Sequence, residues 1–329
     1  MMTILRFPEC ASLESAVPSI HGNDNSEGEN ESMYLAIDTN QQVAWNPILP
    51  VEPTALTITR LAGSDEREVL SYLSRRPART FALAGFIRDN GLTSPLNRGK
   101  FYACRDSRGQ LEGVALIGHA ILFETTDDAA IEVFARLALS HRQAFLALAE
   151  QDKIDKFCHF YAKDGQTPRL VQRELLFEQR GPVVPHEVIP GLRKAGSHDL
   201  SMVVDAHAQL AREERGFDPL EDDAAGFRRR CSARIERGRT WVWTKGNTLI
   251  FKADVISTTP EVTYLEGIWV HESERSKGYG LRCLSQLSET LLRQTSAVCL
   301  LTGEGQLAAQ RFYVKAGFKP VDYYETVYL

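Results

Sequence analysis

The sequence of 329 residues lacks the features typical of membrane, zinc-binding and disulfide-rich proteins. No apolar run approaches the roughly 18 residues that a membrane helix requires. Residues Met1–Ser32 do not follow the basic-then-apolar order of a signal peptide. The six cysteines are scattered without a C-x-x-C pair, and the eight histidines show no metal-ligand spacing. We therefore expect no disulfide framework, no metal site and a cytoplasmic location.

The sequence also lacks an excess of positive charge. It has 38 Lys and Arg against 43 Asp and Glu, and its formal net charge is -5, whereas domains that bind nucleic acids are usually basic. A local run of arginines at 228–239 is interpreted as a solvated helix face, because helix faces commonly carry such charges. We expect neither a nucleic-acid partner nor a membrane partner.

Length and composition indicate two packed domains. Hydrophobic residues make up 43% of the chain, and domains commonly span about 100–200 residues. A polar, acidic stretch at 21–32, followed by Pro47, Pro50 and Pro53, predicts a partly flexible extension over residues 1–54. A second stretch rich in Gly and Pro, at 181–191, places the boundary between the domains, which we expect at 55–185 and 186–329.

Apolar periodicity predicts a similar order of elements in both halves. In the first half we expect a strand at 56–61, helices at 64–74 and 81–90, a hairpin at 101–105 and 111–123, and a long helix at 128–148. In the second half we expect helices at 199–215 and 222–237, a hairpin at 240–244 and 248–256, and strands at 262–270, 297–301 and 323–328, the last two each preceded by a helix. An internal duplication is left open, because the residues of the two halves differ.

A short loop with two glycines, at 275–280, carries the strongest functional signal. It follows the predicted strand at 262–270 and opens a helix whose first turn has unpaired N–H groups. Gly278 and Gly280 would let a phosphate approach the backbone, and Arg275 and Lys277 add positive charge. The alternative is a turn that needs glycine and binds nothing. A P-loop is absent, and a dinucleotide fingerprint would need glycine at Cys283.

Two motifs in order resemble a known family. Residues 275–280 fit R/Q-x-x-G-x-G/A, and residues 306–318 resemble N-x-x-A-x-x-L-Y-x-x-x-G-F, with Gln306 where Asn is usual. With an apolar strand between the motifs, the sequence resembles the GNAT superfamily of N-acyltransferases. The motif-bearing resemblance covers about 188–329. The first half has no such loop and resembles the motif-less N-terminal domain of two-domain GNAT proteins, so we expect it not to bind acyl-CoA.

The resemblance implies a fold of the α+β (α/β) class and a donor substrate. We expect tandem GNAT-like domains, each a mixed, mostly antiparallel sheet flanked by helices, with a parallel strand pair splayed at the acyl-CoA site of the C-terminal domain. Acetyl-CoA is the expected co-substrate, without a metal. Backbone N–H groups at 277–280 would hold the pyrophosphate, and an N–H near Ile268 or Trp269 would polarise the thioester carbonyl. The residues expected to contact acyl-CoA are Ile268, Trp269, Val270, Arg275, Ser276, Lys277, Gly278, Tyr279, Gly280, Gln306, Ala309 and Phe312.

Acyl transfer to an amine requires a base, because a free amine is mostly protonated at neutral pH. On a regular strand, Glu266 would alternate onto one face with the apolar residues of 262–270, where desolvation would raise its pKa. A bulge at Gly267 would instead turn Glu266 outward. His271 and Asp254 are weaker candidates.

The resemblance also assigns a proton donor. It gives Tyr313 the role of the acid that protonates the departing thiolate. The alternative is that Tyr313 packs on a helix face and only borders the donor.

The sequence therefore predicts an acyl-CoA-dependent N-acyltransferase, with acetyl as the default acyl group, in which a small-molecule or peptide amine attacks directly. One alternative is a non-catalytic acyl-CoA-binding or regulatory module. Another is an interaction protein whose first domain presents a peptide to the second. The identity of the amine is left open, as is the choice between a monomer and a homodimer.

Overall fold

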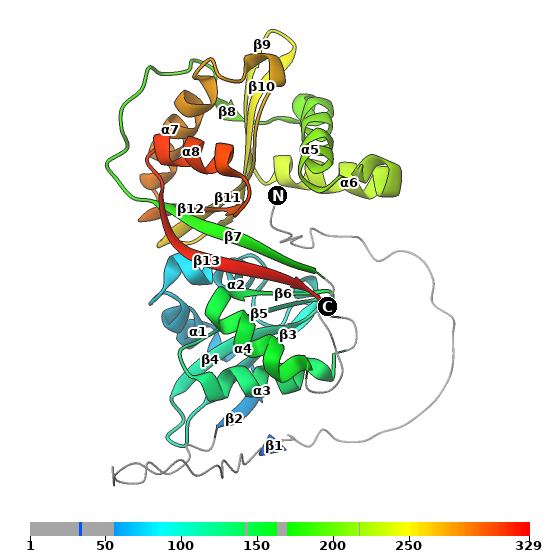
Figure 1. The fold of residues 1–329 in the computed structure, drawn as a ribbon, viewed down its shortest axis with the longest axis vertical. Coiled ribbons are helices and arrows are strands. Elements are labelled where there is room, and N and C mark those ends of the chain that lie inside the picture. The colour runs from blue at the N-terminus through cyan, green and yellow to red at the C-terminus, as the bar shows by residue number, and fades with distance from the viewer. Residues whose placement is uncertain (1–32, 35–55, 142–143, 163–169, 217) are drawn as a thin grey trace.

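The computed structural model describes residues 33–34, 56–141, 144–162, 170–216 and 218–329. The predicted extension over 1–54 lies outside these residues apart from 33–34, and Cys10 lies outside them as well. Within the described part, the strands form one mixed 13-stranded sheet flanked by helices, which confirms the predicted fold class. Figure 1 shows the two halves one above the other, with the N-terminal half below.

The N-terminal half holds seven of the described strands and four of the described α-helices. Its strands are β1 (Met33–Tyr34), β2 (Thr57–Arg60), β3 (Gly99–Arg105), β4 (Leu111–Gly118), β5 (Ala120–Thr125), β6 (Leu146–Glu150) and β7 (Leu170–Gln179). Its helices are α1 (Glu66–Leu73), α2 (Pro77–Asn90), α3 (Asp128–Leu139) and α4 (Gln151–Ala162), with 3-10 turns η1 (Gly63–Asp65) and η2 (Pro95–Asn97).

The predicted long helix at 128–148 is wrong. Helix α3 ends at Leu139, and the apolar residues that follow form β6, in which every residue is buried. A short, continuously apolar run fits a strand covered on both faces as well as it fits a buried helix, so periodicity alone does not separate the two. The predicted strand at 111–123 is likewise divided, because β4 ends at Gly118 and β5 begins at Ala120.

The C-terminal half confirms its predicted elements, with shifts of a few residues at their ends. Its strands are β8 (Arg193–Lys194), β9 (Thr240–Lys245), β10 (Thr248–Thr258), β11 (Val262–Val270), β12 (Ala297–Gly303) and β13 (Lys319–Tyr328). Its helices are α5 (Leu200–Arg215), α6 (Pro219–Glu236), α7 (Tyr279–Leu292) and α8 (Leu307–Lys315), with 3-10 turns η3 (Ser197–Asp199) and η4 (Glu272–Glu274).

The two halves exchange their last strands. The strand order is β1-β2-β3-β4-β5-β6-β13-β7-β12-β11-β10-β9-β8, so β7 lies between β13 and β12, and β13 lies between β6 and β7. Both strands run through the middle of Figure 1 and join the halves. Phe177 of β7 is 1% exposed within the core of the C-terminal half, and Tyr324 of β13 is 3% exposed within the core of the N-terminal half. Each core therefore includes a side chain from the other half.

Helices from both halves cover the same sheet. Helices α7 and α8 cover one face of the C-terminal strands, where Leu284 and Leu287 meet Leu300. Helix α5 covers the opposite face. Beside α5, helix α2 of the N-terminal half reaches β11, where the rings of Phe81 and Tyr264 stack with centroids 4.0 Å apart. The halves are therefore joined by a packed helix as well as by the sheet.

The arginine run at 228–239 is only partly a solvated helix face. The Arg234 side chain is 18% exposed and pairs with Asp254 of β10. Arg239 follows α6 and donates to Asp89 of α2 at 2.7 Å. Arg234 therefore forms an ion pair in the interior, and Arg239 forms one between the two halves.

We predict that Phe177→Ala destabilises the C-terminal half, although β7 belongs to the N-terminal half in sequence. Removing a fully buried phenyl ring leaves a cavity and is expected to lower the free energy of unfolding by about 3–5 kcal/mol. Leu170→Ala on the same strand is the control, because Leu170 is 52% exposed. Urea unfolding followed by circular dichroism measures both variants. Equal stability of the two variants would contradict the exchanged arrangement.

Candidate functional site

The parallel strands β11 and β12 separate midway along their length. They pair from Val262 opposite Ala297 to Leu265 opposite Leu300, and no further. Beyond this point β11 stays paired with β10, and β12 stays paired with β7. The opening lies at the carboxyl ends of the two strands, where ligands commonly bind in sheets with parallel strands. This is the splayed parallel pair that the family resemblance implied.

A bulge interrupts β11 next to the opening. On β10 the paired positions move from Lys252 to Asp254, while on β11 they move from Trp269 to Glu266. The additional residue lies at the bulge formed by Gly267 and Ile268, and Gly267 has φ +59. The bulge therefore shifts the alternation of side chains along β11.

The predicted alternation over 262–270 is wrong beyond Glu266. Ile268 and Val270 pack with α7 and α8, whereas Trp269 packs with α5 on the opposite face. The alternative outcome, in which the bulge turns Glu266 outward, is also wrong. Glu266 is only 9% exposed, and it lies opposite Asp254 on the face covered by α5.

A cavity at the opening brings together several predicted site residues. Glu266 and Ile268 line it from β11, Gln306 lines it from the start of α8, and Tyr313 lines it from α8. Glu214 of α5 completes the set of charged residues in its wall. The cavity therefore holds two carboxylates and one phenol at the end of a splayed strand pair.

Tyr313 is suited to hold its proton. Its ring lies among the rings of Phe177, Phe312 and Phe318, with centroids 5.9, 5.3 and 6.2 Å away. Burial raises the pKa of Tyr313 above its ordinary value of 10.0, and the negative charge of Glu214 raises it further. The phenol therefore keeps its proton to higher pH than an exposed tyrosine does.

Gln306 is the N-cap residue of α8, and its side chain is hydrogen-bonded to the end of β12. Its Oε1 accepts a hydrogen bond from the hydroxyl of Thr302 at 3.2 Å. The amide thus forms a local contact at the position where the resembling family has Asn. Of the other two predicted residues on α8, Ala309 is partly exposed, and the Phe312 ring lies beside the first turn of α7.

The glycine loop forms the start of α7, a helix of 14 residues. Gly278 is its N-cap with φ +82, and a Cβ added there would meet no atom within 4 Å. Gly280 is buried, and a Cβ added there would lie 2.9 Å from Val270 Cγ2. Ser276 also has positive φ, of 63. The first glycine therefore leaves the helix end open, and the second lets the helix approach β11.

Cations surround the glycine loop, and acidic residues hold them. Arg275 pairs with Glu213 of α5 at 3.1 Å, and Lys277 pairs with Glu274 at 3.1 Å. Lys245, from the hairpin between β9 and β10, also pairs with Glu274 at 3.0 Å.

Lys245 was not identified from the sequence. Its ammonium lies 3.9 Å from the centroid of the Tyr279 ring. Its distance in sequence from residues 275–280 gives no local signal for this contact.

Among the residues named from the sequence that do not line this cavity are Trp269 and the two weaker base candidates. The Trp269 side chain is 5% exposed on the α5 side and meets the ring of His271 edge-on at 5.7 Å. His271 Nδ1 lies 2.9 Å from the hydroxyl of Ser273. Asp254 is fully buried and paired with Lys252. Of the three carboxylate and histidine base candidates, only Glu266 reaches the cavity.

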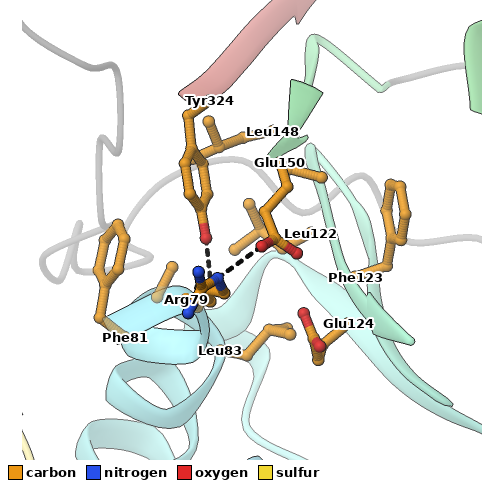
Figure 2. A pocket seen from close by; sticks show the side chains of 11 residues that line it. Arg79, Phe81, Leu83, Leu122, Phe123, Glu124, Leu148, Glu150 and Tyr324 are labelled. Atoms are coloured by element: carbon orange, nitrogen blue, oxygen red, sulfur yellow. Dashed lines mark hydrogen bonds and ion pairs between the residues drawn. The ribbon is translucent and has the colours of Figure 1, made fainter. Parts of the chain in front are cut away.

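The N-terminal half contains a parallel pair that also separates. Strands β5 and β6 pair from Ala120 opposite Leu146 to Leu122 opposite Leu148. Figure 2 shows the pocket beyond that point, where the Arg79 side chain pairs with Glu150 and the hydroxyl of Tyr324 from β13 donates to the backbone carbonyl of Arg79.

Ion pairs occupy this second opening. Glu124 pairs with Arg76 at 2.8 Å and with Lys153 at 2.9 Å, and Glu150 pairs with Arg79 at 2.7 Å. The helix that follows, α3, has Asp127 as its N-cap rather than a glycine loop. Carboxylates at a helix start disfavour a second anion there. The two openings therefore differ in charge, and the expectation that the N-terminal half does not bind acyl-CoA stays a prediction.

The described ranges hold no metal cluster and no membrane-spanning helix. No group of three or more His, Cys, Asp and Glu side chains there is arranged to hold a metal ion. None of the described helices is long and apolar enough to cross a membrane. The five cysteines outside the N-terminal extension are free thiols.

Comparisons with known proteins agree with this geometry. Residues 204–318 match the model of the Acetyltransferase (GNAT) family. An acetyltransferase from the GNAT family of Colwellia psychrerythraea has a TM-score of 0.53 at 14% identity, covering 83% of this chain and 99% of that one. A GCN5-related N-acetyltransferase from Sphaerobacter thermophilus has a TM-score of 0.54 at 12% identity, covering 83% and 95%. A Drosophila protein has a TM-score of 0.56 at 14% identity, covering 83% and 98%. A comparison with curated proteins gives no significant match. The structural likenesses show the fold, and their coverage extends over both halves.

We predict that the two loop glycines differ in their effect on stability. Gly280→Val forces a side chain against Val270 and Phe312 and should cost about 1–3 kcal/mol. Gly278→Ala has open space and should cost about 1–2 kcal/mol from its left-handed backbone alone. Chemical denaturation measures both variants. Restoration of Gly280→Val by Phe312→Leu would confirm the steric cause, and a Gly280→Val variant as stable as the wild type would contradict it.

Proposed function

Because residues 204–318 place the chain in the GNAT superfamily of acyltransferases, we propose that it transfers the acetyl group of acetyl-CoA to an amine. One observation carries the proposal. The strand opening between β11 and β12 adjoins a glycine-opened helix start, and Glu266 and Tyr313 line the same cavity. Acetyl-CoA bound at the helix start would then lie next to Glu266 and Tyr313, the two groups that transfer protons.

The start of α7 is suited to the pyrophosphate of the donor. The first turn of a helix presents unpaired N–H groups and the positive end of the helix dipole. Gly278 leaves this end open, and the cations Arg275, Lys277 and Lys245 lie around it. Each cation is held by an acidic neighbour in the free protein, so a phosphate would compete with Glu213 and Glu274 for them.

The edge of β11 that faces the opening is suited to the thioester. Beyond Leu265 this edge no longer pairs with β12, so its backbone groups are available to an extended ligand arm. The amide N–H near Ile268 would donate to the thioester carbonyl. A fixed N–H at this position stabilises the negative charge that develops on the oxygen during attack.

Proton transfer would use the two side chains in the cavity. The amine nitrogen forms a bond to the carbonyl carbon, and the C–S bond breaks. Glu266 takes the proton from the attacking nitrogen, directly or through water, and Tyr313 gives its phenolic proton to the departing thiolate. The products are an amide and free CoA, with no covalent enzyme intermediate.

The acceptor would be a small-molecule or peptide amine. Glu214 and Glu266 place negative charge in the wall of the cavity, which attracts an ammonium group before it loses its proton. A reducing compartment such as the cytoplasm suits the five free cysteines.

We expect Glu266→Gln and Tyr313→Phe to separate binding from turnover. Acetyl-CoA binding, measured by calorimetry, should stay within about twofold of the wild type. Turnover with an amine panel, measured as free thiol, should fall by about 10²–10⁴-fold, the usual contribution of a positioned acid or base. Glu289→Gln and Tyr323→Phe, both exposed, are the controls.

The outcomes of that experiment distinguish the alternatives. A wild-type protein that binds no acyl-CoA would overturn the proposal. Binding without turnover on any amine would favour a non-catalytic acyl-CoA module. Full turnover in both variants would remove Glu266 and Tyr313 from the mechanism and leave the donor site in place.

The pH dependence tests the role of Tyr313. The phenol must be protonated to act, so activity is lost only as pH rises through its pKa. Because burial and Glu214 raise the pKa of Tyr313, turnover should not decline between about pH 8 and 10. Glu214→Gln removes the charge and should move the decline to lower pH. Profiles of kcat against pH measure both proteins. A decline in the wild type that Glu214→Gln does not move would exclude Tyr313 as its source.

A further inference from the structure

Strand β10 carries two opposite charges into the interior. Lys252 and Asp254 are both 0% exposed. They lie two residues apart and therefore share one face of the strand, the face that α5 and α6 cover. Burial of charged groups is costly unless they are paired, and apolar residues of similar size would often serve stability as well. Their presence next to the bulge of β11 calls for a reason beyond packing.

The lysine is bound to the bulge itself. Lys252 Nζ donates one hydrogen bond to the carboxylate of Asp254 and another, of 3.1 Å, to the carbonyl oxygen of Gly267. A Cβ added to Gly267 would lie 2.8 Å from both Lys252 Nζ and Asp254 Oδ2. Glycine is therefore required here both for its positive φ and for the close approach of the pair.

The aspartate is in turn fixed from three other elements. Thr240 of β9 donates to Asp254 Oδ1 at 2.7 Å. Arg234 of α6 and His207 of α5 lie 3.3 and 3.9 Å from Asp254 Oδ2. Burial alone would raise the pKa of Asp254, but the charges of Lys252, Arg234 and His207 together lower it. The carboxylate is therefore ionised and holds the ammonium in one place.

The direction of the Gly267 carbonyl determines the direction of the next amide. In a planar trans peptide the C=O and N–H bonds point in opposite directions. Strand β11 lies between β10 and β12, with β10 on one edge and the opening on the other. Because Lys252 holds the Gly267 carbonyl, the N–H of Ile268 points away from Lys252, and Ile268 is a residue that lines the opening. Gly267 and Ile268 both line the cavity there.

We propose that Lys252 and Asp254 are positioning residues for acyl transfer, which hold the Gly267 carbonyl so that the Ile268 N–H stays directed at the thioester oxygen. This inference rests on the proposed function. Neither residue touches the substrates. Through His207, Asp254 also contacts α5, which carries Glu214. The same ion pair therefore holds both the bulge at Gly267 and the helix on the acceptor side of the cavity.

The test replaces both charges together with the variant Lys252→Met/Asp254→Leu. Lys252 and Asp254 are removed together so that neither is left buried without the other, and circular dichroism establishes that the variant folds although Arg234 and His207 lose this carboxylate. Its Kd for acetyl-CoA should stay within about threefold of the wild-type value. Its kcat should fall by about ten- to a hundredfold, because loss of one oxyanion-hole donor lowers kcat by about a hundredfold or more and here the donor is only misdirected. Lys156→Met/Asp128→Leu, which removes an ion pair from the N-terminal half, is the matched double-substitution control and should leave kcat unchanged.

A second measurement needs no turnover. In the wild type, acetyl-CoA should shift the ¹⁵N–¹H resonance of Ile268 downfield, and in the double variant this shift should shrink or vanish. A double variant with wild-type kcat and a wild-type Ile268 shift would overturn the positioning role and leave the proposed function intact. A wild-type protein that binds no acetyl-CoA would overturn both.

Discussion

The antiparallel pairing of β7 with β13 is the contact on which the rest of the structure depends. Each strand is the last of its half, and each lies against the sheet of the other half. Strand β7 holds the outer edge of β12 along its length, so β12 follows β7 where β11 turns away from it. Phe177 of β7 also lies beside Tyr313. A strand from the half without the glycine loop therefore helps to shape the candidate site.

The sheet geometry alone does not make a donor site, as the two halves show. Both contain a parallel pair that separates after three or four residue pairs. In one half a glycine-opened helix follows, and the cavity is lined by Glu266 and Tyr313. In the other, Arg79 and Lys153 neutralise the carboxylates in place, and an aspartate starts the helix. The chemistry is determined by which charges remain available to a ligand.

Local patterns in the sequence predicted the elements of the C-terminal half and the glycine loop, and the family resemblance implied the splayed pair. They failed where distant segments decide the outcome. Strand β6 was interpreted as helix because its apolar run has no period of its own, and the exchange of β7 and β13 leaves no local signal. The alternation along β11 failed at Gly267, although glycine within a strand is a known sign of a bulge. Lys252 and Asp254, two residues apart in an apolar strand, are a local signal of a buried ion pair.

The exchange of strands has a consequence for the order in which the chain acquires its structure. Strand β6 pairs with β13, and the C-terminal half up to β13 lies between these two strands in the sequence. Strand β6 therefore lacks this partner until the C-terminal half has been synthesised. The N-terminal half, although synthesised first, therefore remains an open sheet with an exposed edge until the C-terminal half has emerged. Such long-range pairing slows folding and leaves that edge exposed to other chains in the interval.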